Sequence, residues 1–357
     1  MTIFESPTLT SMPVSNSKHG YCRIHHPTMK KTLDIPVVYS ESGRVYEIGE
    51  LIRTTRMGQV FHIHELVKLP GVDGFVRSPE DLAVKTYKKQ AIMAMQMKGS
   101  EENPANEMMA LSLLNHMSPH ANVMSIKEIF SDAENFYMVM PFMSGGDLLD
   151  VMENTIGEYG QANCFSHEMA RDMFSDVMSG LQHLHSHGIA HRDLSIENVL
   201  YNPNTESFSI IDLGMCLRLP KDEASGQYLP IRRRNICGKK NYIAPEVWAE
   251  LPVFHPMKCD IWAMGVMLFM VLTASAPMEQ AVPSDPHFMA IVHKRIEDVY
   301  IASQRSYRSE TDSASMISEE MKLALDLVQQ MLQLDPNKRP SIEQILQHPY
   351  MNYGAGI

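Results

Sequence analysis

Residues 191–198 constrain this chain more than any other stretch. They read HRDLSIEN and run directly into the apolar pair Val199 and Leu200. A second acidic stretch, DLG at 212–214, follows an apolar strand expected over 208–211. Metal-assisted phosphoryl transfer needs an aspartate that accepts a hydroxyl proton, and further oxygen ligands that hold metal ions. Asp193, Asn198 and Asp212 have the chemistry for these tasks.

Length and composition narrow the class of protein. The chain has 357 residues, enough for two domains or one two-lobed domain. Its net charge of -11 argues against a nucleic-acid-binding surface. The five cysteines are scattered without a CxxC pair, and no secretory signal opens the sequence. We therefore expect a cytoplasmic or nuclear protein, and we expect the apolar stretch 261–274 to be a buried core helix rather than a membrane span.

The order of the predicted elements divides the chain. Residues 1–44 are rich in Ser, Thr, Pro and His without a sustained apolar period, which predicts a mostly disordered tail. Short strand-like runs follow, and the stretch 141–147 (PFMSGGD) predicts a hinge to a helical remainder. Strands are expected over 45–51, 59–65, 82–87, 123–130 and 136–140, and helices over 107–114, 147–152, 166–187, 319–334 and 341–347. The Ser-rich stretch within 298–320 predicts a mobile loop.

Two charged residues of the front half are candidates for a site. Lys85 ends the apolar strand LAVK, from which an ammonium group can point at phosphates. Glu107 opens a helix and can pair with it. Each has a plainer reading: strand lysines more often face solvent, and glutamate is favoured at helix starts by the helix dipole alone.

Taken in order, these motifs resemble those of eukaryotic protein kinases of the serine/threonine type, over residues 46–351. The matching features are LAVK at 82–85, Glu107, HRDLSIEN, DLG, APE at 244–246, DIWAMG at 260–265 and Arg339. The resemblance implies an α+β, two-lobed fold with a small antiparallel-sheet N-lobe, one main helix in that lobe and a larger, mainly helical C-lobe. It implies a kinase domain over 45–351, divided into an N-lobe with hinge (45–143) and a C-lobe (144–351), after the tail 1–44 and before a short tail at 352–357.

The resemblance also implies roles for the catalytic groups. Asp193 would orient the substrate hydroxyl and accept its proton, and Asn198 and Asp212 would hold two Mg²⁺ ions. Lys85, braced by Glu107, would hold the inner phosphates of ATP.

Further residues would surround the nucleotide or support the helical lobe. Main-chain groups of Pro141 and Met143 would meet adenine, Met140 would limit the rear of the pocket, and Val60, Ala83 and Leu200 would sandwich the ring. Asp147 would reach the ribose or a basic substrate residue. Glu246 and Arg339 would form a buried ion pair, and Asp260 would cap the central helix and tie it to the catalytic loop.

The phosphate-covering loop departs from the family pattern GxGxxGxV. Arg53 and Thr55 replace the first two glycines, and only the third, Gly58, remains. Side chains at the first two positions hold the backbone away from phosphates. We therefore expect weaker ATP binding than a three-glycine loop provides.

The catalytic loop departs from the pattern in a paired way. The family usually carries a lysine two residues after the catalytic aspartate and a threonine ahead of YxAPE, whereas this chain has Ser195 and Lys239 there. One interpretation is a positional exchange, in which Lys239 supplies the ammonium group near the transferred phosphate and Ser195 supplies the hydroxyl that steadies Asp193. The other is that the site is degraded.

The activation segment lacks the usual phosphorylation site. Asn235 stands at that position, just after three arginines at 232–234, and the remaining acceptors Ser225 and Tyr228 are displaced from it. We infer that activity does not require phosphorylation at the usual place.

The sequence thus predicts an ATP- and Mg²⁺-dependent kinase that phosphorylates serine or threonine in protein substrates. The alternative is a pseudokinase that acts as a nucleotide-binding switch or scaffold. We expect a monomeric catalytic domain without nucleic-acid partner or membrane span, on which a separate regulatory partner can act.

Overall fold

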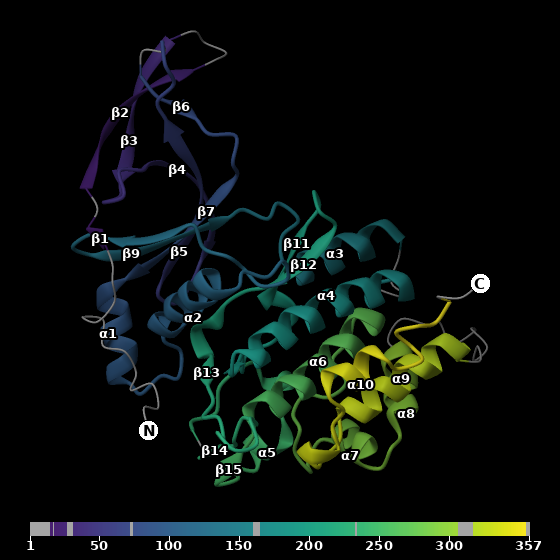
Figure 1. Ribbon diagram of the computed structural model, residues 1–357. Coiled ribbons are helices and arrows are strands. Elements are labelled where there is room, and N and C mark those ends of the chain that lie inside the picture. The colour runs from purple at the N-terminus through teal and green to yellow at the C-terminus, as the bar shows by residue number, and fades with distance from the viewer. Residues whose placement is uncertain are drawn as a thin grey trace. The chain divides into compact units, whose positions relative to one another are not determined.

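The computed structural model of the protein describes residues 15–16, 18–26, 31–71, 74–159, 165–232, 234–305 and 317–354. The described chain divides into two compact units (Figure 1). The strand-rich unit contains the residues up to His120 together with Met124–Phe142. The helical unit begins at Met143 and also includes Ala121–Val123. The chain therefore passes between the units within the predicted hinge.

One curled sheet forms most of the strand-rich unit. Its strand order is β1-β8-β9-β7-β5-β4-β3-β2, with β6 paired to β5. All pairings are antiparallel except that of β1 with β8. The strands are β1 Ser15–Asn16, β2 Lys18–His26, β3 Lys31–Tyr39, β4 Val45–Thr54, β5 Gly58–Val67, β6 Val76–Arg77, β7 Leu82–Lys88, β8 Glu128–Ser131 and β9 Asn135–Pro141.

Strands β2 and β3 correct the prediction of a mostly disordered tail over 1–44. They pair along their whole length, and β3 continues the sheet by pairing Val38 with Tyr46 of β4. Val37 and Val38 are 2% and 3% exposed. These β-branched side chains suit a pleated surface, and their burial outweighs the polar composition of the surrounding residues. Residues 1–14, 17 and 27–30 of the expected tail lie outside the described residues.

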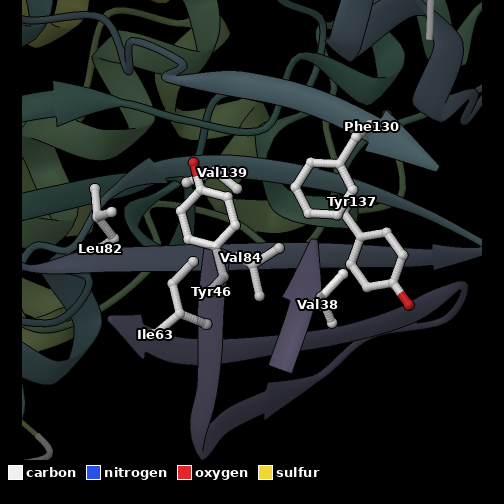
Figure 2. Packing of buried hydrophobic residues seen from close by; sticks show 8 residues of the cluster. All are labelled: Val38, Tyr46, Ile63, Leu82, Val84, Phe130, Tyr137 and Val139. Atoms are coloured by element: carbon white, nitrogen blue, oxygen red, sulfur yellow. The ribbon is translucent and has the colours of Figure 1, made fainter. Parts of the chain in front are cut away.

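An apolar cluster fills the curl of the sheet. Figure 2 shows its side chains gathered between the strands: Val38, Tyr46, Ile63, Leu82, Val84, Phe130, Tyr137 and Val139. The Phe130 ring stacks against Tyr46 and Tyr137, with centroid separations of 5.9 and 4.9 Å. Successive side chains of a strand point to opposite faces, so Leu82 and Val84 of β7 enter this core and Lys85 points to the other face.

Two helices complete the strand-rich unit, α1 Lys89–Met97 and α2 Pro104–Met117. Helix α2 begins three residues before its expected start at Glu107. Asn103 caps it by accepting a hydrogen bond from the Ala105 amide at 3.0 Å, and Pro104 takes the first helical position. Glu107 therefore lies in the first turn, where it is 3% exposed.

Helix α6 (Pro256–Thr273) forms the core of the helical unit. It is the one helix in the described ranges that is long and apolar enough to cross a membrane, but its side chains, among them Trp262 and Met264, are buried inside the unit. This confirms the predicted core helix. The other helices are α3 Leu148–Tyr159, α4 His167–Ser186, α5 Pro245–Trp248, α7 Pro286–Val292, α8 Ile296–Arg305, α9 Glu319–Met331 and α10 Ile342–Leu346.

Three short antiparallel ladders lie in the same unit: β10 (Ile189–Ala190) with β13 (Leu217–Arg218), β11 (Val199–Asn202) with β12 (Ser207–Ile210), and β14 (Ile231–Arg232) with β15 (Val253–Phe254). Part of the expected loop, the Ser-rich stretch at 303–318, is helical, because α8 continues to Arg305. Residues 306–316 of that loop lie outside the described residues.

The predicted ion pair between Glu246 and Arg339 is present and buried. The Nη1 and Nη2 atoms of Arg339 each lie 2.6 Å from an oxygen of Glu246. The two side chains are 0% and 1% exposed, and the guanidinium group also donates to the carbonyls of Gln333 and Lys258. A paired charge at this depth is strongly destabilising only when its partner is removed.

We predict that Arg339→Met lowers the free energy of unfolding by about 3 to 5 kcal/mol, because it leaves the Glu246 carboxylate buried without its partner. Arg295→Met is the matched control. It breaks an exposed pair with Asp298 and should change stability by about 1 kcal/mol or less. Equal losses in the two variants, measured by urea denaturation, would contradict the structural role given to Arg339.

Candidate active site

The carboxylate of Asp260 holds the backbone of the catalytic loop, residues 191–198. Its oxygens accept hydrogen bonds from the amides of His191 and Arg192 at 2.9 and 2.8 Å, and one also lies 2.9 Å from Nε2 of His185. Arg192 has a φ of 70°, a left-handed conformation that costs energy for a non-glycine residue. The predicted tie between Asp260 and the loop is therefore present. The expected cap is wrong, because α6 begins at Pro256 and Asp260 lies one turn inside it.

Asp193 and Asn198 are joined within the loop. The side-chain amide of Asn198 donates to the Asp193 carbonyl at 2.7 Å and to its carboxylate Oδ2 at 3.1 Å. The amide of Asp193 donates to Nδ1 of His191 at 3.2 Å. Because Nδ2 of Asn198 is directed at Asp193, its Oδ1 is directed elsewhere and is suited to bind a cation.

The β11–β12 ladder brings Asp212 beside this loop. The amide of Ile211 donates to the Asn198 carbonyl at 3.0 Å, and the Ile211 carbonyl lies 2.9 Å from Nε2 of His191. Asp212 follows with a φ of 62°, and its Oδ1 accepts from the Gly214 amide at 3.3 Å. The two predicted metal ligands thus lie at one end of the same hairpin.

The oxygen donors of Asn198 and Asp212 suit Mg²⁺, and they suit it better than they suit a metal ion that takes all of its ligands from the protein. Across the described ranges, no group of three or more His, Cys, Asp or Glu residues is placed to bind a metal ion. One amide oxygen and one carboxylate are hard ligands, and Mg²⁺ usually takes its remaining ligands from water and substrate phosphates. Asn198 and Asp212 therefore suit an ion that arrives with a nucleotide.

Lys239 and Ser195 are in direct contact, although 44 positions separate them. Nζ of Lys239 lies 2.5 Å from Oγ of Ser195 and 3.3 Å from Oε2 of Glu197. Gly238 allows this approach. Its φ is 92°, and a Cβ there would lie 3.0 Å from the Arg192 carbonyl oxygen. The hydroxyl and ammonium groups named in the exchange hypothesis are thus together on the catalytic loop.

The charge on Asp193 responds to these neighbours. Burial raises the pKa of its carboxyl group, and the nearby Asp212 carboxylate acts in the same direction. The Lys239 ammonium group is the largest charge that opposes this rise in pKa. Asp193 therefore takes a proton more readily than an exposed aspartate, as a group that accepts a substrate proton should.

In the strand-rich unit, Lys85 and Glu107 form the expected ion pair. Nζ of Lys85 lies 2.9 and 3.1 Å from the two Glu107 oxygens. The hydroxyl of Tyr87 also donates to Glu107, and the Lys85 ammonium lies 5.3 Å from the centre of its ring. The sequence analysis missed Tyr87. The signal available was its place two residues after Lys85, which puts both side chains on one face of β7.

The sheet register places the expected adenine-contacting residues of this unit on the Lys85 face. Val60 pairs with Lys85, and Ala83 pairs with Met140. Residues directly opposite in a sheet share a face, so all four side chains lie opposite the apolar cluster. Pro141 ends β9 opposite Leu82.

Met143, Asp147 and Leu200 belong to the helical unit. Asp147 forms a backbone bridge with Leu200 and is 3% exposed. Its Oδ1 accepts from the Asp150 amide at 3.0 Å, so it caps helix α3. This capping role is what the structure assigns to Asp147, and a contact with ribose or substrate stays a prediction.

The glycine-poor loop forms a closed turn between β4 and β5. The Thr55 amide donates to the Gly58 carbonyl at 2.9 Å, and Oγ1 of Thr55 accepts from the Gly58 amide at 3.1 Å. A Cβ on Gly58 would lie 1.8 Å from the Thr86 carbonyl oxygen. Gly58 is therefore required by the packing of β5 on β7, independently of any phosphate. Weaker ATP binding through Arg53 and Thr55 stays a prediction.

Comparison with known families decides the identity of this arrangement. The model of the protein kinase domain matches residues 76–351. The chain belongs to the protein kinase family. The matched range begins after the loop at 53–60, in which Arg53 and Thr55 stand at glycine positions of the kinase pattern. The α+β fold, with a curled antiparallel sheet and a mostly helical remainder, is confirmed as the two-lobed kinase fold.

Curated relatives of this chain carry the names of protein kinases, two of the three given below those of serine/threonine-protein kinases. Ribosomal protein S6 kinase alpha-2 of Mus musculus is 29% identical over 255 residues, which are 71% of this chain and 31% of the relative. A probable serine/threonine-protein kinase CCRP1 of Zea mays is 32% identical over 240 residues (67% and 33%). Serine/threonine-protein kinase PLK4 of Drosophila grimshawi is 27% identical over 308 residues (84% and 35%). The chain thus spans about a third of the length of these relatives.

We predict that Lys239→Met moves the acidic limb of the kcat/KM pH profile to higher pH. Removing the ammonium group removes the largest charge that lowers the pKa of Asp193, so this carboxylate becomes protonated at a higher pH. Lys239→Arg keeps the positive charge and should leave the limb near its wild-type position. An unchanged limb in Lys239→Met would show that this cation does not act on Asp193.

Proposed function

We propose that this kinase is catalytically active and transfers the γ-phosphoryl group of ATP to serine or threonine hydroxyls of protein substrates. The observation that carries the proposal is that Asp193, Asn198 and Asp212 lie together at the catalytic loop, whose backbone is held by Asp260. A carboxylate, an amide oxygen and a second carboxylate are the groups that kinase chemistry uses. The names of the curated relatives support the serine/threonine class.

The proposed mechanism assigns Asp193 to the substrate. Its carboxylate accepts a hydrogen bond from the substrate hydroxyl, orients it, and takes its proton as the new O–P bond forms. The bond between the γ-phosphorus and the bridging oxygen breaks in the same transfer, and ADP leaves. Mg²⁺ ions bound at Asn198 and Asp212 would neutralise charge on the phosphates of ATP. General-base assistance of this kind contributes about 10²- to 10⁴-fold, so positioning and charge neutralisation supply most of the remaining rate.

Lys85 is proposed to hold the inner phosphates of ATP. Its ammonium group already has a buried partner in Glu107, which orients it on the face of the sheet that carries Val60, Ala83 and Met140. We propose that these apolar side chains contact the adenine ring, together with Leu200 and main-chain groups of Pro141 and Met143.

We further propose that Lys239 and Ser195 have exchanged the roles their positions usually have. The 2.5 Å contact between them supports the exchange, because a degraded site gives no reason for an ammonium group to lie on the catalytic loop. In this proposal Lys239 stabilises charge that develops on the transferred phosphoryl group, a contribution of about 10²- to 10³-fold for one well-placed group. Ser195, which is fully buried, supplies the hydroxyl that steadies Asp193.

Contacts of the activation segment support activity without phosphorylation at the usual place. The hydroxyl of Tyr228 donates to the Ser186 carbonyl at 2.8 Å, and its side chain packs with Ile231 against the buried cluster Ala190, Leu219 and Met257. The β14–β15 ladder holds the next part of the segment. None of these contacts needs a phosphate, which also fits Asn235 at the usual acceptor position.

A cytoplasmic or nuclear location and a monomeric catalytic domain remain part of the proposal.

The pseudokinase alternative makes a different prediction for Asp193. We expect bacterially expressed, phosphatase-treated protein to transfer labelled phosphate from ATP to a mixed serine/threonine substrate such as casein. Asp193→Asn keeps the size of the side chain and removes the proton acceptor, so transfer should fall by at least about 10²-fold. Equal incorporation by wild type and Asp193→Asn, with ATP bound by both, would reject the enzyme and leave the switch or scaffold.

A further inference from the structure

A cationic segment stands out on this acidic chain. Residues 231–240 read IRRRNICGKK, with five Lys or Arg and no Asp or Glu. The whole chain has 31 Lys and Arg against 42 Asp and Glu, a net charge of -11. Ten residues that carry only positive charges create a local positive potential on a chain whose net charge is negative.

Both ends of this segment are held in place. At its start, Ile231 and Arg232 form β14 and pair with Phe254 and Val253. Near its end, a Cβ placed on Gly238 would lie 3.5 Å from Oδ1 of Asp193. The segment therefore runs from a fixed ladder to the catalytic aspartate.

Two arginines of the segment, Arg232 and Arg234, face solvent without a balancing acid. Arg232 and Arg234 are exposed, and in the described part of the chain neither forms an ion pair. Lys240 lies 3.5 Å from Glu279, but both side chains are more than half exposed, so this pair is weak. Arg233 lies outside the described residues.

The ammonium group of Lys239 offsets the negative charge of Glu197. It lies 3.3 Å from the carboxylate of Glu197, the acidic residue on the catalytic loop beside Asn198. A substrate residue that approaches Asp193 from this side therefore meets the cations of the segment and a Glu197 that is already paired. Acidic side chains are attracted there, and basic ones are repelled.

We infer that Arg232 and Arg234, the exposed and described arginines of this segment, select protein substrates with acidic residues close to the phosphorylated serine or threonine. Arg234 is four residues from Gly238, at most about 14 Å along an extended chain. An extended substrate covers a similar distance in about four residues, so the acidic residues fall within about four positions of the acceptor. This inference rests on the proposed kinase activity and adds a substrate class to it.

The test compares two synthetic peptides that differ only in charge. Each contains one serine, flanked by three Glu in the first peptide and by three Gln in the second. Each exposed charge pair is worth a factor of roughly 1.5 to 5, so kcat/KM should be roughly tenfold higher for the Glu peptide. The difference should shrink in 0.5 M NaCl, because salt screens exposed charges.

Charge reversal identifies the residues responsible. Arg232→Glu with Arg234→Glu should lower kcat/KM for the Glu peptide to the level of the Gln peptide and leave the Gln peptide unchanged. The matched control, Arg295→Glu with Lys322→Glu, makes the same change in net charge at two exposed sites, one just before helix α8 and one on α9, and should preserve the preference. Loss of the preference in the control would assign it to net charge and overturn the inference.

Two further outcomes separate this inference from the proposed function. Transfer to both peptides with equal kcat/KM would overturn the acidic preference and leave the kinase activity standing. If neither peptide is phosphorylated, the proposed activity fails, and binding of fluorescent peptides to Asp193→Asn tests the acidic preference by itself. Tighter binding of the Glu peptide, lost when Arg232 and Arg234 are changed to Glu, would support the cationic surface. Equal binding of both peptides would overturn the inference as well.

Discussion

The catalytic loop depends on one buried carboxylate, that of Asp260. Its two oxygens accept the amides of His191 and Arg192 and thereby hold Arg192 in a left-handed conformation that it would not otherwise adopt. This backbone conformation sets the direction of the Asp193 side chain, and the side-chain amide of Asn198 donates hydrogen bonds to Asp193. Because Asp260 projects from the most buried helix of its unit, the geometry of the loop is fixed by the packing of the helical core rather than by exposed contacts.

The contact between Lys239 and Ser195 gives the two departures of the catalytic motif a common explanation. Considered one at a time, a serine for a lysine and a lysine for a threonine each weaken a kinase site. Considered together, they keep one ammonium group and one hydroxyl group beside Asp193, with Gly238 providing the close backbone approach. The same lysine pairs with Glu197, which leaves the exposed arginines upstream as the dominant charge along the segment.

Sequence reasoning predicted those parts of the fold and site that rest on local pattern. The core helix α6 follows from its apolar composition and the catalytic loop from its motif. The distant Glu246–Arg339 pair was implied by the family resemblance alone. Pairings between distant segments were harder to predict. Strands β2 and β3 were predicted to be a tail because their polar composition hides the β3–β4 pairing. Tyr87 was missed because its partner Glu107 lies 20 positions away. The hydrogen bond by which Asp147 caps helix α3 was not predicted.

The exchange of roles is tested most directly by reversing it. Phosphotransfer is measured for wild type, Lys239→Thr, and the double variant Ser195→Lys with Lys239→Thr, which restores the usual order of the two groups. The exchange predicts that Lys239→Thr loses about 10²- to 10³-fold in kcat and that the double variant recovers to within about tenfold of wild type. A double variant no more active than Lys239→Thr, or a Lys239→Thr variant with full activity, would contradict it.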